Sequence, residues 1–144
     1  MQFRYKGYEQ FGVLKRPVIQ VVLRNPRQTN APVIAYEALV DSGSDRNIFP
    51  AELASLIGVD LTSTEKVRDI GGVVAGELRR VYFHPVEIEL GGLGGPSLVT
   101  HVGFMTDFSN IGYGLLGRRG FFNQFSFVKF KELESTLEIG KVRK

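Results

Sequence analysis

The chain has 144 residues, of which 43% are hydrophobic and 23% charged, as expected for one globular domain with its own core. It has no run of about 20 apolar residues, so we expect no membrane-spanning helix and no membrane partner. It has no cysteine, which excludes disulfides, thiolate zinc sites and cysteine nucleophiles. Lysine and arginine exceed aspartate and glutamate by 18 − 15 = 3, and we interpret residues 141–144, which carry part of this excess, as a solvated tail.

The N-terminal residues 1–12 carry charges and aromatic rings where a secretory signal would have an apolar segment. We therefore expect no cleaved signal. The absence of cysteine is compatible with a reducing compartment, and we expect a cytoplasmic protein in which residues 1–144 form a single domain.

Most of the chain has the apolar, β-branched patterns that predict strands. The alternation is clearest where Val86, Ile88 and Leu90 face one side and Glu87 and Glu89 the other. The predicted strands cover residues 18–23, 33–40, 81–90, 98–105, 125–131 and 136–139.

Helix signals are few. Pro50 is a favourable first helical residue, the run 51–57 follows it, and Gly58 ends the helix. A second short helix is predicted over 118–124, although Gly120 in its middle disfavours a helix there. Many short strands with glycine-rich turns favour a barrel or a sandwich over a doubly wound sheet.

The first predicted helix is preceded by the turn Asp41-Ser42-Gly43-Ser44, directly after an apolar strand. One ionised carboxylate is a weak catalyst of amide hydrolysis, whereas two carboxylates about 3 Å apart share a proton and supply a general base and a general acid. Such a pair needs a tight turn with small neighbours, which Ser42 and Gly43 provide.

The Asp-Ser-Gly sequence occurs once, because none of the other four aspartates, Asp45, Asp60, Asp69 and Asp107, is followed by Ser/Thr-Gly. A second carboxylate would therefore have to come from a second copy of the chain. A twofold axis through the site achieves this, because a C2 interface is self-complementary.

Two motifs resemble the retropepsin-like aspartic proteases. Residues 39–44, Leu-Val-Asp-Ser-Gly-Ser, are similar to the active-site signature of this family. Residues 115–122, Leu-Leu-Gly-Arg-Arg-Gly-Phe-Phe, are similar to its second hallmark, an apolar pair followed by Gly-Arg and a short helix. The two motifs lie about 75 residues apart, and the resemblance covers residues 15–139.

This resemblance implies an all-β closed barrel with one or two short helices and an active site at a homodimer interface. Asp41 matches the catalytic aspartate, and Ser42 matches the residue whose hydroxyl interlocks the two subunits. Gly43 matches the glycine near the substrate, and Ser44 completes the active-site turn. No metal and no organic cofactor is implied.

The resemblance also implies a flap, a glycine-rich hairpin that closes over an extended peptide or protein substrate. Residues 70–76 are similar in type, and Ile70, Gly71, Gly72 and Val73 are the expected substrate-binding residues.

An ion pair between Asp45 and Arg118 is expected from the same family pattern. Retroviral members dimerise through their terminal strands, and the extra length after residue 125 leaves open whether residues 135–139 do so here.

The resulting functional hypothesis is an aspartic endopeptidase that activates one water between two Asp41 carboxylates. The alternative is a catalytically silent domain of the same fold that dimerises or binds peptides. A third possibility, nucleic-acid binding through the basic tail, is disfavoured, and we expect no nucleic-acid partner. The two histidines, His84 and His101, lack metal-ligand spacing and are interpreted as core or surface residues.

Overall fold

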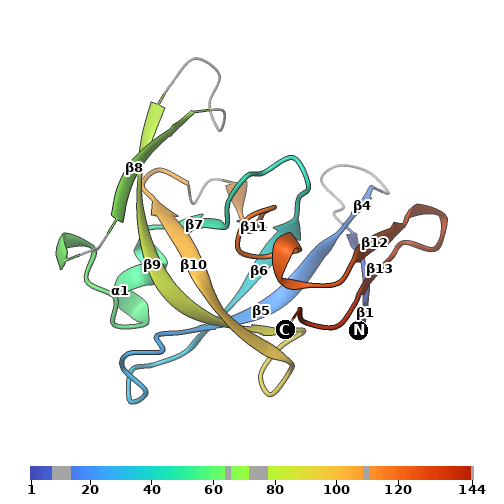
Figure 1. Ribbon diagram of the computed structural model, residues 1–144, viewed down its shortest axis with the longest axis horizontal. Coiled ribbons are helices and arrows are strands. Elements are labelled where there is room, and N and C mark those ends of the chain that lie inside the picture. The colour runs from blue at the N-terminus through green and yellow to red at the C-terminus, as the bar shows by residue number, and fades with distance from the viewer. Residues whose placement is uncertain (8–13, 64–65, 72–77, 109–110, 144) are drawn as a thin grey trace.

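A computed structural model of the chain describes residues 1–7, 14–63, 66–71, 78–108 and 111–143 (Figure 1). Its strands are β1 (Gln2–Arg4), β2 (Lys6–Gly7), β4 (Lys15–Arg16), β5 (Val18–Arg24), β6 (Ile34–Val40), β7 (Ile48–Pro50), β8 (Lys66–Gly71), β9 (Leu78–Leu90), β10 (Ser97–Met105), β11 (Gly114–Leu116), β12 (Val128–Lys131) and β13 (Thr136–Ile139). The helical segments are α1 (Glu52–Leu56) and the single 3₁₀ turns η1 (Leu61–Ser63), η3 (Phe122–Gln124) and η4 (Glu132–Glu134).

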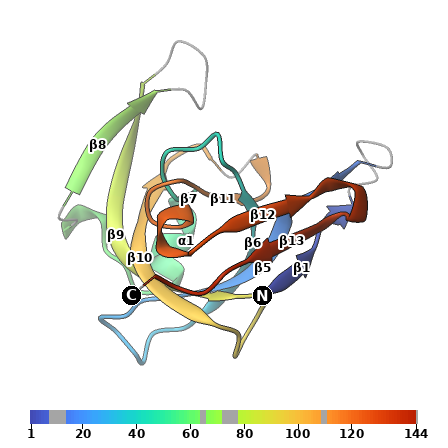
Figure 2. The same ribbon diagram turned by 45° about the vertical axis from the view of Figure 1, so that its right-hand side comes forward.

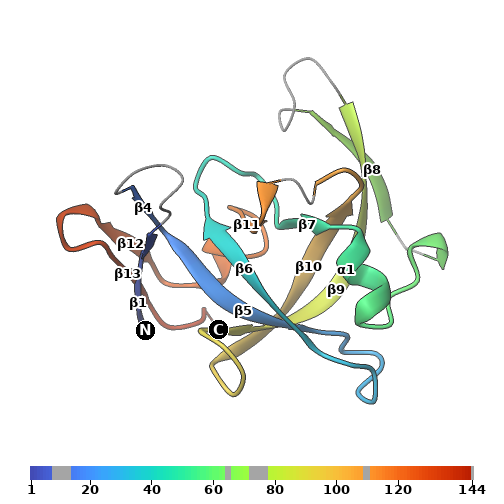
Figure 3. The same ribbon diagram turned by 180° about the vertical axis from the view of Figure 1, so that it is seen from behind.

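Six strands close into a barrel in the order β10–β7–β11–β6–β5–β9, because β9 pairs back onto β10. Closure depends on the length of β9, which has 13 residues. One edge of β9 pairs with β10 along most of its length, while the other edge pairs first with β8 and then with β5. The expected all-β closed barrel is thus confirmed. Seen from behind in Figure 3, β5 and β6 cross the face of the barrel that is turned away from the viewer in Figure 1.

The strand patterns direct apolar side chains into one main core. Val86, Ile88 and Leu90 on β9 are buried, as their alternation predicts. Glu89 alternates with them but is also buried, contrary to the pattern, because Arg24 and the Gly94 N–H donate hydrogen bonds to it at 2.6 and 2.7 Å. The largest fully buried side chains of the core are Phe49, Phe104, Phe121, Leu23, Ile57, Ile88, Leu90, Leu116, Leu137 and Ile139.

The two helix predictions have different outcomes. The first helix forms as α1, but Pro50 is the last residue of β7, paired with Met105, and not the first helical residue. The second is wrong over most of its length: only η3 forms. Gly120 adopts a left-handed φ of +99°, and Arg119 forms a parallel bridge with Arg46, so no helix can run through this segment.

The phenylalanines from residue 121 to residue 130 differ in burial. Phe121 and Phe125 are buried and pack edge to face, with ring centroids 5.0 Å apart. Phe122 is half-buried, whereas Phe127 and Phe130 are exposed. Phe127 lies just before β12 and Phe130 lies within it, and β12 belongs to the three-stranded sheet β1–β13–β12 and not to the barrel.

Both ends of the described chain meet in a small sheet with the order β1–β13–β12 (Figure 2). The N-terminal ammonium of Met1 donates to Ile139 O at 2.8 Å, and Leu137 and Ile139 are fully buried. Because β13 is the central strand, both of its edges pair within its own chain. No helix within the described residues is long and apolar enough to cross a membrane.

Candidate active site

Strand β6 carries Asp41 to the end of a buried ladder. Val40 is buried and pairs in parallel with Leu116 of β11, and the Asp41 N–H donates to Leu116 O at 3.0 Å. The main chain of Asp41 is therefore fixed by the neighbouring strand, while the residue itself is half-buried. The apolar residues before Asp41 hold the strand in the core, and the carboxylate lies where the strand leaves it.

A tight turn then positions the carboxylate. The Ser44 N–H donates to Asp41 O at 3.1 Å, and the Gly43 N–H donates to Asp41 Oδ1 at 2.8 Å. A Cβ on Gly43 would lie 3.1 Å from the same oxygen, which is tighter than an ordinary contact. Glycine at 43 therefore lets the main chain approach the carboxylate closely enough to hydrogen-bond it.

The loop from this turn to β7 is held by the segment that follows β11. The N–H groups of Arg118 and Arg119 donate to the carbonyls of Ser44 and Asp45 at 2.8 and 2.9 Å. A Cβ on Gly117 would lie 2.6 Å from the carbonyl carbon of Arg46, so only glycine permits this close packing of two main chains. The two sequence motifs thus meet, and the second motif supports the first.

Asn47 is a supporting residue that the sequence reasoning missed. It is fully buried, its Oδ1 accepts the Gly117 N–H at 3.0 Å, and its Nδ2 donates to His101 O at 3.2 Å. Its carbonyl also accepts the Gly103 N–H. One side chain therefore ties the Asp41 loop to β10 and β11, and the only signal for it is a polar residue directly before the apolar pair Ile48-Phe49.

The predicted ion pair between Asp45 and Arg118 is not formed. Both side chains are exposed, and no ion pair joins them among the described residues. The main-chain hydrogen bonds named above connect the two segments instead, so the contact does not need the opposite charges.

The two serines of the turn have different environments. Ser42 is exposed, and its hydroxyl makes no hydrogen bond within the part of the chain that the structure describes. Ser44 is half-buried, and its hydroxyl donates to Arg46 O at 2.7 Å. Apart from the Gly43 N–H, the carboxylate of Asp41 has no hydrogen-bond or ionic partner among the described residues.

The first two predicted flap residues lie at the end of β8, which pairs with β9 up to Gly71 and Leu78 in the β8–β9 hairpin. Ile70 and Gly71 are the last residues of β8, while Gly72 and Val73 lie outside the described residues. All three views of the whole chain place this hairpin and the loop between β6 and β7 at the same end of the barrel (Figures 1–3).

The two histidines have separate environments. His84 is buried, with its Nδ1 3.2 Å from Pro85 O, and His101 is exposed on β10. No group of three or more His, Asp or Glu side chains placed to hold a metal occurs among the described residues.

Comparison with a solved structure decides the fold. The crystal structure of a retropepsin-like aspartic protease from Rickettsia conorii superimposes with a TM-score of 0.54, covering 95% of this chain and 88% of that one. This chain has the retropepsin-like fold. The two sequences are only 13% identical, so this similarity shows a shared fold and nothing more specific. No protein-family model and no curated protein sequence matches the chain.

Proposed function

We propose that this chain is an aspartic endopeptidase whose active site is built from the Asp41 residues of two copies. The observation that carries the proposal is the setting of Asp41. It directly follows β6, whose last residue Val40 is buried, one carboxylate oxygen is held by the Gly43 N–H, and the carboxylate has no other partner among the described residues.

Two such carboxylates related by a twofold axis would share one proton, because like charges a few ångströms apart cannot both ionise. The ionised carboxylate takes a proton from the water held between them, and the protonated one gives its proton to the substrate carbonyl oxygen. The water oxygen bonds to the carbonyl carbon and forms a gem-diol. This intermediate collapses when a carboxyl group protonates the leaving nitrogen and the C–N bond breaks.

The second copy would approach through the active-site turn. Strand β13 has no free edge, since β1 and β12 of the same chain occupy both sides. Ser42 is exposed beside Asp41, and its hydroxyl is available for a hydrogen bond across the axis. We therefore propose a dimer that forms at the turns without exchange of β13.

The substrate in this proposal is an extended peptide between the Asp41 turn and the β8–β9 hairpin. Exposed main-chain groups of a hairpin bind an extended peptide by β-type hydrogen bonds, which give affinity without demanding one sequence. Closure of the hairpin would exclude water from the reacting groups.

The test is digestion of a diverse peptide pool at acidic to neutral pH by the wild type and the Asp41→Asn variant, with the mass of each followed by sedimentation. We expect a cleaving wild-type dimer and an inactive Asp41→Asn dimer. Asp60→Asn is the matched control: this exposed aspartate lies in the turn after α1 and accepts hydrogen bonds from Thr62, which an asparagine oxygen can also accept.

Cleavage that survives in Asp41→Asn would refute the proposal. A wild-type dimer that binds peptides but never cuts them would favour the catalytically silent module.

A further inference from the structure

We propose that the hairpin formed by β12 and β13 binds a second copy of this chain, with the tip of each hairpin docked on the outer face of the other. The tip, residues 132–135, projects from the barrel on the side away from the β8–β9 hairpin in all three views (Figures 1–3). At the tip the side chain of Leu133 is fully exposed. The inference names the partner surface of the dimer proposed above and rests on that dimer.

The tip of the hairpin is held in one conformation by Tyr5. This buried residue donates its hydroxyl to Glu132 Oε2 at 3.2 Å and its N–H to Ser135 O at 2.8 Å. The Ser135 N–H donates to Glu132 O at 3.1 Å and closes the turn. Leu133 is therefore presented to solvent by a fixed main chain, which lowers the entropic cost of docking it on a partner.

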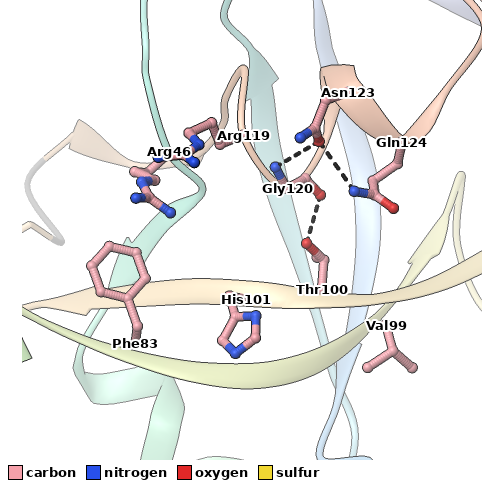
Figure 4. Close-up of a pocket in the computed structure, with 9 residues that line it drawn as sticks. All are labelled: Arg46, Phe83, Val99, Thr100, His101, Arg119, Gly120, Asn123 and Gln124. Carbon is pink, nitrogen blue, oxygen red and sulfur yellow. Dashed lines mark hydrogen bonds between the residues drawn. The ribbon is translucent and has the colours of Figure 1, made fainter. Parts of the chain in front are cut away.

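The base of the hairpin is anchored to the barrel. Gly120 O accepts the hydroxyl of Thr100 on β10 at 2.6 Å, and the Gly120 N–H donates to Asn123 Oδ1 at 2.9 Å (Figure 4). Gln124 O accepts the Arg143 N–H at 2.7 Å, so the chain before β12 and the chain after β13 are tied together. The hairpin thus has a fixed base as well as a fixed tip.

An exposed aromatic ring lies at the end of the hairpin opposite to the tip. The ring of Phe127 is exposed, yet it lies against the main chain of Gly140, where a Cβ would come within 2.7 Å of Phe127 Cδ1. The Gly140 N–H also donates to Phe127 O at 2.9 Å. Glycine at 140 therefore gives the ring a fixed place at the surface. Aromatic rings held in this way are typical anchors of protein interfaces.

Charged side chains continue this outer face beyond Phe127. Glu138 lies between two buried residues of β13, so its side chain is on the other face of the sheet, together with that of Lys129 directly opposite. Lys131 lies 3.1 Å from the same carboxylate. Its hydrogen bond, with the charge of Lys129, lowers the pKa of Glu138 below the ordinary value. The outer face of the hairpin thus presents one ring, two cations and one carboxylate.

The tip and the outer face complement each other. Exposed Leu133 is flanked by the exposed Glu132 and Glu134, and the outer face places Phe127 two residues from Lys129. The tip follows β12 and the ring precedes it, so two hairpins packed antiparallel bring the tip of each over the ring of the other. The leucine then packs on the ring, and glutamate lies near lysine. A twofold axis forms both contacts at once.

The contact proposed at the active-site turns needs such an addition. Ser42 and Gly43 are exposed there, but they offer little apolar surface. Stable interfaces bury about 1,200–2,000 Å² in total around an apolar core. The hairpin supplies apolar side chains and charges of both signs to the same dimer.

The experiment measures the dissociation constant of the dimer by sedimentation equilibrium of the full chain. Leu133→Ala is expected to weaken the dimer by about tenfold, because a packed leucine anchor is lost. Leu93→Ala is the matched control, since this leucine is also exposed, in the turn between β9 and β10, and we expect a change below about twofold. Urea denaturation of Leu133→Ala at a concentration where the chain is monomeric checks that the variant folds.

Charge reversal tests whether the tip meets the outer face. Glu134→Lys and Lys129→Glu are each expected to weaken the dimer. A chain with both changes is expected to recover most of the lost affinity, because tip and face again have opposite charges across the axis.

The inference is overturned if Leu133→Ala dimerises as tightly as Leu93→Ala, if the double reversal is no tighter than the single ones, or if the wild type is monomeric at every concentration. A dimer that depends on Leu133 but never cleaves peptides would keep this contact and contradict the proposed endopeptidase. A dimer that cleaves through Asp41 without depending on Leu133 would contradict this contact alone.

Discussion

At the scale of single residues, the loop that carries Asp41 depends on Asn47. Its carboxamide satisfies the Gly117 N–H and His101 O in a fully buried position. Asn47→Ala would leave both groups without a partner, and each unsatisfied buried group costs about 1–3 kcal/mol. We expect Asn47→Ala to lower the free energy of unfolding by about 2–4 kcal/mol, measured by urea denaturation. The exposed Asn30→Ala is the control, and an equal loss in both variants would contradict this role.

The sequence drew attention to this loop but not to what supports it. Asp41, Ser42 and Gly43 were singled out because a carboxylate after an apolar strand and before two small residues is unusual, and their catalytic role stays a prediction. Asn47 was missed because burial of one asparagine depends on where β10 and β11 lie in space. The Asp45–Arg118 pair failed for a related reason: charges in a family pattern do not show whether main-chain contacts already hold the segments together.

At the scale of elements, the terminal sheet is held by the buried face of β13. Leu137 is fully buried in this strand, while Leu133 in η4 is fully exposed. Replacing a buried leucine by alanine removes apolar contacts and leaves a cavity, which typically costs about 2–5 kcal/mol. We expect Leu137→Ala to lose that much in urea denaturation and Leu133→Ala to stay within about 0.5 kcal/mol of wild type. Similar losses in both variants would show that this sheet does not pack on the core.

The contact between Arg24 of β5 and Glu89 of β9 makes a pH-dependent contribution to the stability of the fold. The Arg24 guanidinium, with the Gly94 N–H, donates to Glu89 and lowers the pKa of its carboxyl below the ordinary value of about 4.5. A carboxyl whose pKa is lower in the folded than in the unfolded chain stabilises the fold at every pH above the unfolded-state pKa. This stabilisation is lost as the pH falls through the folded-state pKa.

Glu89→Gln removes this contribution, so we expect its Tm to fall less than that of the wild type between about pH 6 and pH 3. The exposed Glu134→Gln serves as the control. Parallel Tm profiles for wild type and Glu89→Gln would contradict the assignment.

Strands with long apolar, β-branched runs were predicted well at this scale, because such runs are typical of buried strands. Strands β5, β6, β10 and β13 lie within a residue or two of the predicted ranges. Short elements such as β7 and β11 were not predicted. Each has three residues, which is too short to show a periodic arrangement of apolar residues in the sequence. Their pairing partners are also distant in the chain.

At the scale of the whole molecule, the barrel places the Asp41 loop and the β8–β9 hairpin at one end, and the terminal sheet is complete within one chain. The strand pattern predicted a barrel or a sandwich, and the family resemblance predicted the closed barrel, but neither predicted the closed terminal sheet. Its three strands are short, and its pairing joins residues 2–4 to residues 136–138. Because both edges of β13 are paired within one chain, the dimer proposed above does not depend on exchange of this strand.

The most direct measurement of the shared active site is peptide cleavage by mixed dimers. Wild type at fixed concentration is refolded together with a ninefold excess of Asp41→Asn, so that subunits pair at random. Because a mixed dimer has one carboxylate, we expect cleavage to fall roughly tenfold, whereas the same excess of Asp60→Asn increases it. Cleavage that is unchanged by the Asp41→Asn excess would mean that each chain acts alone, and would contradict a site built from two copies of Asp41.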